Sequence, residues 1–440
     1  MSAAPRAKVE IVNFGCRLNL VEGEAMRCAA EAAGRDNLVI VNTCAVTAEA
    51  ARQARQTIRR LKREAPERTI IVTGCAAQTA PQTFAAMLEV TKVLGNAEKL
   101  DAEAFRPDAA GRIAVGDIFA APAAPPPVRG AVEDHTRAFL AIQTGCDHRC
   151  TFCIIPYGRG PSRSTPAEAI IAAAKDCVAR GFQEIVLTGV DLTAYGRDID
   201  GRPGLGKLVK AILRAAPDLA RLRLSSIDCI EADDTLLDAI ASEKRLMPHL
   251  HLSLQAGSDM ILKRMKRRHS RTDAVRFCTE IRAARPDIVF GADLIAGFPT
   301  ETEAMSAETL ALVEDCGLTH LHVFPFSPRP GTPAAQMPQL AQEVIAARAK
   351  ALRQAGAAAL ARHLDAQTGR TLSLLTERGG TARAEDFTRV QVGHVPAGRL
   401  IAAEITGHDG TMLLARPVAA LDASLNASLN ASLGRIAEMA

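Results

Sequence analysis

The chain contains no apolar run that could span a membrane. No stretch of its 440 residues reaches the roughly 20 consecutive apolar residues that a bilayer helix needs. The first twelve residues carry Arg6, Lys8 and Glu10 without a long apolar core, which is not typical of a secretory signal peptide. We therefore expect a cytoplasmic protein that has no membrane partner.

Aromatic residues and net charge are also scarce. Trp is absent, there are only 2 Tyr, and the formal net charge is +4. A charge this small permits a nucleic-acid partner but does not require one. Hydrophobic residues are not scarce, because they make up 48% of the chain, and this composition excludes a disordered protein. The length suits two or three domains.

The N-terminal third is predicted to form a small parallel α/β sheet. Three short segments rich in Val and Ile are typical of buried strands, namely Val9–Phe14, Leu38–Val41 and Thr69–Val72. Helical stretches separate them, roughly Leu20–Ala33 and Thr47–Glu64, the second with Thr47 as N-cap. Alternation of strands and helices predicts parallel pairing.

A longer α/β series follows and predicts a partial (β/α)6 barrel with its chemistry at the C-terminal strand ends. The six expected strands are Phe139–Gln143, Glu184–Thr188, Arg221–Ser225, His249–Leu254, Val289–Leu294 and Thr319–Phe324. The expected helices include Pro166–Arg180, Leu205–Ala216, Arg271–Ala284 and Glu303–Cys316. A long Ala-rich helix, about Leu340–Ala366, ends this part.

The remainder of the chain changes character. Short β segments separated by Gly predict a small β-barrel, and these are Leu372–Thr376, Arg389–Val392, Arg399–Ile405 and Met412–Ala415. The Pro/Ala run Ala120–Val128 is typical of a semi-rigid linker. We expect an N-terminal domain over residues 1–119, a linker over 120–130, the barrel over 131–366, the β-barrel over 371–418 and a repetitive tail over 419–440.

The 11 cysteines are expected to be reduced in the cytosol, so some of them should be metal ligands. Cys146, Cys150 and Cys153 form a C-x3-C-x2-C run just after the first barrel strand, with Phe152 beside the last cysteine. Three thiolates this close can hold three irons of a [4Fe-4S] cluster, and the absence of a fourth cysteine leaves one iron open for another ligand. The alternatives are a zinc site or three incidental buried thiols.

A second set of cysteines is dispersed in the sequence. Cys16, Cys44 and Cys75 each follow one of the three N-terminal strands. Because the carboxyl ends of parallel strands share one edge of a sheet, these thiolates should converge and hold a second cluster. A single cysteine at a strand end is more often simply buried.

The other five cysteines have a simpler interpretation. Four lie in predicted helices among apolar neighbours and one follows the third barrel strand, so we expect all of them to be small buried core residues. They are Cys28, Cys177, Cys229, Cys278 and Cys316.

Motifs spread over almost the whole chain resemble the methylthiotransferase family of radical-SAM enzymes. Around the second cysteine set, GCRLNLVEGE (15–24) and NTCAVT (42–47) are most similar to the branch that acts on N6-threonylcarbamoyladenosine (t6A) of tRNA. The barrel adds YGRGPSRS (157–164), TGVDLTAYG (188–196), HLHLSLQAGSD (249–259), GADLIAGFPTET (291–302) and HVFPFSPRPGTPAA (322–335). The C-terminal β segment is similar to the RNA-binding TRAM domain. Ala256 and Thr300 depart from the family pattern, which has Ser and Gly there.

The resemblance implies two [4Fe-4S] clusters and two uses of S-adenosylmethionine (SAM). One SAM would methylate a sulfur on the auxiliary cluster at Cys16, Cys44 and Cys75. The other would be cleaved at the cluster of the first triad, and the resulting 5′-deoxyadenosyl radical would activate C2 of the adenine. Neither step needs a general base, so no catalytic residue is assigned beyond the cluster ligands.

Five further residues are candidate SAM contacts. Gly189 follows the second barrel strand and could allow a close approach of the methionyl end. Candidates for the ribose and adenine lie on or after the fourth and fifth strands, and these are Ser253, Gln255, Asp293 and Gly297. The alternative is that they are ordinary polar groups of the barrel interior.

Two pairs of histidines have the spacing that places both members on one strand face, His249 with His251 and His320 with His322. Such pairs can bind zinc, but the cysteines already supply metal ligands, so we expect these histidines to pack within the sheet.

Basic residues recur in two places and are candidate tRNA contacts. One helical face carries Arg52, Arg55, Arg59 and Lys62, and a denser run contains Lys263, Arg264, Lys266, Arg267, Arg268 and Arg271. A solvated surface is the alternative for both. Phe387 is the only aromatic residue between Thr371 and Pro417, so that module would bind RNA mainly through charge and shape.

The predicted function is therefore addition of a methylthio group to C2 of t6A at position 37, with the tRNA anticodon loop, an electron donor and a sulfur source as partners. The resemblance also implies a monomer. The same chemistry on isopentenyladenosine of tRNA or on a ribosomal-protein aspartate is one alternative. A non-catalytic iron–sulfur protein that binds RNA is the other.

Overall fold

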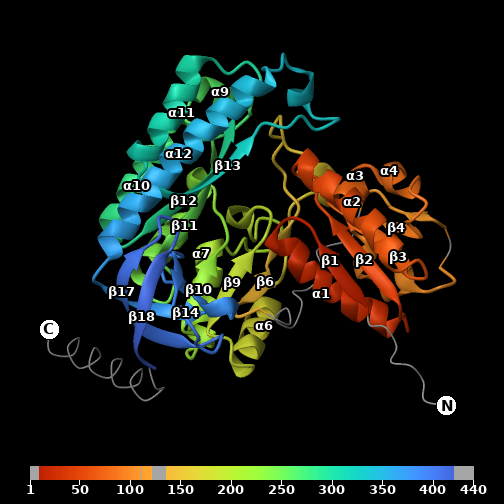
Figure 1. Ribbon diagram of the computed structural model, residues 1–440, viewed down its shortest axis with the longest axis horizontal. Coiled ribbons are helices and arrows are strands. Elements are labelled where there is room, and N and C mark those ends of the chain that lie inside the picture. The colour runs from red at the N-terminus through yellow and green to blue at the C-terminus, as the bar shows by residue number, and fades with distance from the viewer. Residues whose placement is uncertain (1–8, 110, 121–134, 421–440) are drawn as a thin grey trace.

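The chain folds into three successive parts, of which the first two are α/β and the third is a β-barrel. A computed structural model describes residues 9–109, 111–120 and 135–420 (Figure 1). A parallel sheet in red and orange is followed by a curved set of six strands in yellow to cyan and by a small blue barrel. The expected α/β fold class is confirmed.

The N-terminal sheet has five parallel strands in the order β1-β2-β3-β4-β5. Its strands are β1 (Glu10–Asn13), β2 (Leu38–Thr43), β3 (Thr69–Gly74), β4 (Lys92–Leu94) and β5 (Ile113–Ala114). Its helices are α1 (Arg17–Ala32), α2 (Ala48–Glu64), α3 (Cys75–Thr79), α4 (Pro81–Ala85), η1 (Glu98–Leu100) and η2 (Ala102–Phe105).

Helices cover both faces of this sheet. Val39 and Val41 of β2 pack on Ile58 of α2, whereas Leu38 and Ile40 pack on the opposite face against α1. Side chains alternate along a strand, so a continuous apolar run such as β2 must be buried on both sides. Thr47 caps α2 as expected, because its Oγ1 accepts a hydrogen bond of 3.1 Å from the backbone of Ala50.

The sequence prediction of this sheet was incomplete. β4 and β5 were missed because three and two residues are too short to show a period. The first helix begins at Arg17 and not at Leu20, because the chain turns into the helix directly after Cys16, its N-cap residue.

Six parallel strands form the middle part, in two hydrogen-bonded sheets ordered β10-β9-β6 and β11-β12-β13. Isolated bridges join the sheets at Leu222–Leu246 and Ile227–Leu252, which makes one open arc, the expected partial barrel. The strands are β6 (Ala138–Ala141), β9 (Glu184–Thr188), β10 (Arg221–Leu224), β11 (His249–Gln255), β12 (Val289–Ala296) and β13 (Leu318–Pro325).

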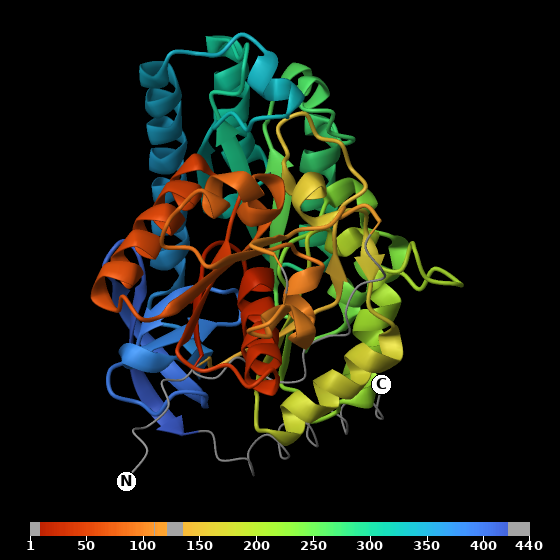
Figure 2. The ribbon, with the colours of Figure 1, turned by 90° about the vertical axis from the view of Figure 1, so that its right-hand side faces the viewer.

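Helices and short elements surround this arc. The helices are α5 (Ile155–Arg159), α6 (Ala167–Ala179), α7 (Leu205–Ala215), α8 (Asp234–Ser242), α9 (Asp259–Arg264), α10 (Arg271–Ala284), α11 (Glu303–Asp315) and α12 (Gln342–Gln367). The short elements are the hairpin β7 (Gln143–Thr144) with β8 (Arg163–Ser164), and η3 (Leu192–Ala194), η4 (Cys229–Glu231) and η5 (Pro333–Gln336). Figure 2 shows the N-terminal sheet in front of the arc. Val21 of α1 packs there on Phe139 and Val186.

The C-terminal part is a closed barrel with the strand order β14-β15-β16-β18-β17. Its elements are β14 (Thr371–Thr376), η6 (Arg378–Gly380), β15 (Thr381–Ala384), β16 (Arg389–Gln391), β17 (Leu400–His408) and β18 (Leu413–Ala420). Leu364 of α12 is fully buried in the barrel core. The small β-barrel is confirmed, although β15 was missed.

Four of the five remaining cysteines lie in the core of the six-strand arc, as expected: Cys177, Cys229, Cys278 and Cys316. The expectation for Cys28 was wrong, because this thiol is exposed on the outer face of α1. Most of the expected linker and of the repetitive tail lie outside the described residues. Within the described parts of the chain, no helix is long and apolar enough to cross a membrane.

Candidate functional site

The first cysteine triad lies on one loop at the C-terminal end of the barrel strands. Cys146, Cys150 and Cys153 line a cavity of about 150 Å³. The loop is anchored at both ends, because the Cys146 amide donates to the Gly160 carbonyl at 3.1 Å and the Thr151 amide donates to the Met265 carbonyl at 3.1 Å. The structure therefore brings these three thiols together.

Two thiols of this loop, those of Cys146 and Cys153, are poorly placed to ionise unless a cation joins them. Burial raises the pKa of Cys153 to about 12, and the nearby Cys150 and Cys75 add to the rise. Burial also raises the pKa of Cys146, and the Asp191 carboxylate raises it further. A metal ion reverses this preference, since a coordinating thiol loses its proton. The three-sulfur donor set thus fits an iron–sulfur cluster with one open iron.

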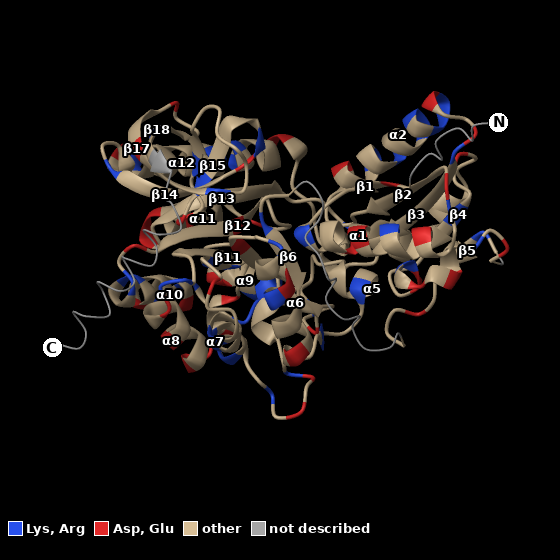
Figure 3. Ribbon diagram, turned by 90° about the horizontal axis from the view of Figure 1, so that it is seen from below, with Lys and Arg blue, Asp and Glu red and all other residues tan. Residues whose placement is uncertain are grey.

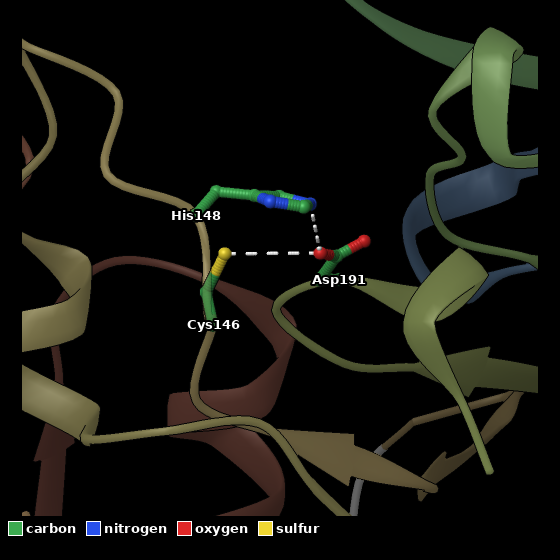
Figure 4. Close-up of side chains that lie close together, drawn as sticks. All are labelled: Cys146, His148 and Asp191. Carbon is green, nitrogen blue, oxygen red and sulfur yellow. Dashed lines mark hydrogen bonds and ion pairs between the residues drawn. The ribbon is translucent and has the colours of Figure 1, made fainter. Parts of the chain in front are cut away.

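Sequence reasoning missed the acidic groups around this loop. The Cys146 Sγ lies 3.7 Å from Asp191 Oδ2, which also pairs with His148 Nε2 at 2.9 Å (Figure 4). Glu231 accepts a second contact from the same imidazole at 3.4 Å. The hydrogen bonds to Asp191 and Glu231 raise the pKa of His148 to about 9. The quoted motif TGVDLTAYG contained Asp191, but nothing in it pointed to the cysteine loop.

Arg267 corrects part of the expectation about basic residues. It belongs to the run that was expected to face tRNA or solvent, but its guanidinium is buried in the small cavity. It donates to Asp228 Oδ2 at 2.7 Å and to the Ser253 carbonyl at 2.6 Å, and it lies 3.8 Å from the Cys150 Sγ. Because its guanidinium is buried and already paired, Arg267 positions the site and cannot bind a phosphate on the surface.

The second triad lies at the edge where the N-terminal strands end. The strands β1, β2 and β3 are in parallel register, with Asn13 opposite Asn42 and Thr43 opposite Gly74. The residues that follow them are therefore neighbours, and these are Cys16, Cys44 and Cys75.

Several contacts show how close these three thiols lie. A Cβ atom on Gly15 would stand 2.9 Å from the Cys44 Sγ. Burial raises the pKa of Cys44 to about 11, and Cys75 and Cys16 contribute to the rise. Asn96 donates to the Cys75 Sγ at 3.7 Å. The expected convergence is present, and ligation of a cluster by these thiols stays a prediction.

A buried ionic network joins the two triads. Glu22 of α1 accepts from Lys99 at 2.6 Å and from Arg159 of α5 at 2.7 Å. Burial alone would raise the pKa of Glu22, but the two cations outweigh it and lower the pKa to about 2. A Cβ atom on Gly158 would lie 3.2 Å from the Cys75 Cβ, so α5 packs directly on the second triad.

A larger cavity of about 820 Å³ opens beside the second triad and has the size of a ligand site. All three parts of the chain line it. The N-terminal part contributes Cys16, Arg17 and Cys44. The six-strand arc contributes Gly189 and Asp293, and the C-terminal barrel contributes Arg383 and Phe387. Ser226 lines both this cavity and the smaller one, so the two adjoin.

The five candidate SAM residues do not share one cavity. Ser253 and Gln255 line the small cavity at the first triad, whereas Gly189 and Asp293 line the large one. Gly297 lines neither, because Ile345 of α12 occupies the space beside it, and a Cβ atom on Gly297 would stand 2.7 Å from that side chain. The structure therefore does not bring Gly297 to the predicted site.

All four histidines line the large cavity, and each member of one sequence pair contacts a member of the other. His249 and His320 pack inside the sheet with ring centroids 5.5 Å apart, and burial lowers the pKa of both, that of His320 to about 4. His251 and His322 instead contact Asp293 Oδ1 at 2.8 and 3.2 Å on the wall of the large cavity. The packing expectation thus describes His249 and His320, one member of each predicted pair, whereas His251 and His322 are also bonded to a carboxylate.

The basic face of α2 is on the surface (Figure 3). Arg52 pairs with Glu49 at 2.6 Å, and Lys62 donates to the Arg68 carbonyl at 2.8 Å. Arg59 is exposed and lines a surface hollow with Arg60 and Arg63. Arg55 is half-buried and has no hydrogen-bond or ion-pair partner among the described residues, so it is open to a phosphate together with Arg59, Arg60 and Arg63.

Comparisons with known proteins agree with this arrangement. Residues 140–313 match the radical SAM superfamily, and residues 8–95 match a family described as uncharacterized protein family UPF0004. The solved radical SAM methyltransferase TsrM of Kitasatospora setae shares the fold, with a TM-score of 0.56 at 15% identity over 74% of this chain and 75% of that one.

Curated relatives cover most of the chain. The threonylcarbamoyladenosine tRNA methylthiotransferase MtaB of Rickettsia prowazekii is 48% identical over 90% of this chain and 94% of the relative. The tRNA-2-methylthio-N(6)-dimethylallyladenosine synthase of Cereibacter sphaeroides is 36% identical over 85% of this chain and 88% of the relative. Both names describe methylthio transfer. The chain belongs to the radical-SAM methylthiotransferase family.

Proposed function

We propose that the protein adds a methylthio group to C2 of N6-threonylcarbamoyladenosine at position 37 of tRNA. The observation that carries the proposal is the 48% identity, over 94% of its length, to a relative whose name states this activity. The dimethylallyladenosine relative is less similar, at 36% identity, and its substrate is the main competitor. The geometry supports methylthio transfer in either case, because two cysteine triads lie beside adjoining cavities.

The family uses SAM and two [4Fe-4S] clusters, and the chain has donors for both. Cys146, Cys150 and Cys153 would hold the cluster that binds SAM, and Cys16, Cys44 and Cys75 would hold the auxiliary cluster. When bound, these groups supply reductive cleavage of SAM and the sulfur that is methylated and transferred.

The chain's own residues would bind and orient the reactants. Ser253 and Gln255 offer polar groups to SAM in the small cavity, and Arg267 fixes that wall through Asp228. His148 stays protonated at neutral pH, since its pKa is about 9, and it ties the cysteine loop to Asp191 and Glu231. Gly189 lies on the wall of the large cavity and packs closely on Gln143, since a Cβ atom there would stand 3.0 Å from the Gln143 carbonyl oxygen.

The partners follow from the reaction. The anticodon loop of tRNA would enter the large cavity, and the arginines of α2 would contact its phosphates. The reaction also requires an electron donor and a sulfur source. We propose that the protein acts in the cytoplasm as a monomer.

The test is a nucleoside analysis of tRNA. Total tRNA would be digested from a strain that lacks the gene, from the same strain complemented with the wild type, and from one complemented with Cys44→Ala. Mass spectrometry should show 2-methylthio-t6A only with the wild type, and its unthiolated parent should rise in the other two strains.

The other outcomes are equally specific. Unchanged 2-methylthio-t6A in the deletion strain would refute the substrate assignment. Loss of methylthiolated isopentenyladenosine instead would assign the competitor substrate, and an unmodified ribosomal-protein aspartate would assign the third. The non-catalytic alternative requires that the reduced, cluster-loaded protein release no 5′-deoxyadenosine from SAM.

A further inference from the structure

Arg17 is a cation on the wall of the large cavity. It is the first residue of α1 and follows Cys16 of the second triad directly. Among the residues that the structure describes, no carboxylate lies within ion-pair distance of its guanidinium, and no acceptor takes a hydrogen bond from it. Partly buried arginines are normally paired, so this one is available to a ligand.

The position of Arg17 is locally unfavourable, which argues that it has a function. The first turn of α1 contains no acidic residue, and a positive charge at a helix N-terminus opposes the helix dipole. The guanidinium lies 5.5 Å from the ring centroid of Phe387, a residue of the C-terminal barrel. Phe387 adopts a φ of +72°, a backbone conformation that a bulky residue rarely adopts. Two unfavourable features therefore occur at this cavity, namely the cation at the N-terminus of α1 and the positive φ of Phe387.

The charges around Phe387 do not balance. Four guanidinium groups surround its ring, and three of them have carboxylate partners. Arg223 pairs with Glu184 at 3.0 Å, and Glu377 pairs with Arg137 at 2.8 Å and with Arg383 at 3.4 Å. Glu184 and Glu377 supply two carboxylates for the four guanidinium groups, and Arg17 is the one without a direct partner in the described parts of the chain, so an anion that enters the cavity would find it open.

We propose that Arg17 binds the carboxylate of the threonyl group of t6A and so selects this substrate. The inference rests on the proposed function. Only N1 separates C2 from the carbon that bears N6, so the N6 substituent lies at the same edge of the base as the atom that receives sulfur. Arg17 follows a cysteine of the proposed auxiliary cluster, and its planar fork matches a carboxylate.

The same residue would reject the competing substrate. A dimethylallyl group has no charge, so its binding would leave the Arg17 guanidinium buried and unpaired. Sites that are built for a polar group discriminate strongly against an analogue that lacks it. A backbone phosphate of the tRNA is the other source of an anion, and the experiment separates the two.

The test measures binding of anticodon stem-loop RNAs that differ only at position 37. One RNA carries t6A, the second its threonyl methyl ester, and the third unmodified adenosine, and fluorescence anisotropy of the labelled RNA follows binding to the cluster-loaded protein. The wild type should prefer t6A over the ester by about tenfold or more. Arg17→Gln should abolish this preference without changing the affinity for the ester, and Arg17→Lys should retain part of it.

Arg27→Gln is the matched control, because Arg27 lies on the same helix but pairs with Glu24 and Glu31 away from the cavity. It should keep the full preference. If Arg17→Gln does not fold, as judged by circular dichroism and iron content, Arg17→Lys carries the test through a reduced preference at unchanged ester affinity.

Two results overturn the inference while leaving the proposed function intact. The preference for t6A could survive in Arg17→Gln, or Arg17→Gln could weaken all three RNAs equally, which would indicate a phosphate contact. A wild type that binds the acid and the ester equally also overturns it. Failure of the proposed function is seen separately, as unchanged 2-methylthio-t6A in the deletion strain.

Discussion

The two cysteine triads are positioned by different parts of the structure. One loop of eight residues carries Cys146, Cys150 and Cys153, and hydrogen bonds to Gly160 and to the more distant Met265 hold it in place. Cys16, Cys44 and Cys75 come from three separate strand ends, and only the register of the sheet brings them together. The first site should therefore respond to changes in its loop, and the second to changes anywhere along the edge of the sheet.

The largest expected effect comes from removing one ligand of each triad. Cys150→Ala and Cys44→Ala should each lose about half of the iron, because each triad holds one of two clusters. Cys150→Ala should abolish SAM cleavage. Cys44→Ala should still cleave SAM but lower methylthiolated product by at least about 100-fold, since loss of a ligand exceeds the usual cost of losing a supporting residue. Iron analysis and product quantification by mass spectrometry measure both.

Cys28→Ala is the control for this pair, since Cys28 is exposed on α1 outside both triads. It should keep all of the iron and the activity. Full iron in Cys44→Ala would show that the second triad holds no cluster.

Glycine-to-alanine substitutions should affect the two sites independently, because different backbone contacts support each site. A Cβ atom on Gly145, at φ +72°, would overlap the Pro161 carbonyl next to the first triad. A Cβ atom on Gly74, at φ +94°, would overlap the Thr43 carbonyl next to the second. Each alanine variant should cost at least about 2 kcal/mol of stability and lower the occupancy of its own cluster alone.

Gly34→Ala is the matched control, because Gly34 also has a positive φ, at +70°, but open space around it. It should cost about 1–2 kcal/mol and leave both clusters loaded. Iron content with urea unfolding distinguishes the three variants, and equal loss of both clusters in Gly74→Ala would contradict independent support.

The network that joins the two sites should have a smaller but pH-dependent effect on stability. Glu22→Gln leaves Lys99 and Arg159 buried without their carboxylate, which should cost about 3 kcal/mol. The pKa of Glu22 is lowered from 4.5 to about 2 in the folded protein. Its contribution is therefore complete above pH 4.5 and is lost as the pH falls toward 2.

Urea unfolding between pH 7 and pH 3 tests this prediction. The difference between wild type and Glu22→Gln should shrink as the pH falls. Glu24→Gln on the same helix is the control, because Glu24 pairs with Arg27 near the surface, and it should cost less than about 1 kcal/mol. A pH-independent difference for Glu22→Gln would contradict the network.

The smallest effect is expected on the surface of α2. Arg59→Gln should weaken tRNA binding a few-fold for every tRNA and reduce the slope of log affinity against log salt by about 1, because it removes one phosphate contact. Arg52→Gln should change less, since Glu49 already occupies Arg52. Binding isotherms at several salt concentrations measure both, and an unchanged slope for Arg59→Gln would place the tRNA elsewhere.

Much of the fold could be predicted because its longer strands are either apolar runs or alternations of apolar and polar residues, with helical stretches between them. The strands that were missed, β4, β5, β8 and β15, have at most four residues, too few for a pattern to emerge. The candidate site was less predictable. Arg267 belonged to a charged run, and only the approach of β11 and η4 made it a buried partner of Asp228. Gly297 matched a motif, but the packing of Ile345 decided its surroundings.

Sequence alone determined the first triad, because its three ligands lie within one loop whose spacing sets their separation. It also determined the order of strands and helices, since that order follows from local hydrophobic patterns. Only the tertiary structure decided that Arg17 and Phe387, 370 residues apart, would meet at one cavity without a carboxylate for Arg17. Long-range charge balance depends on which surfaces pack together, and no local pattern encodes it.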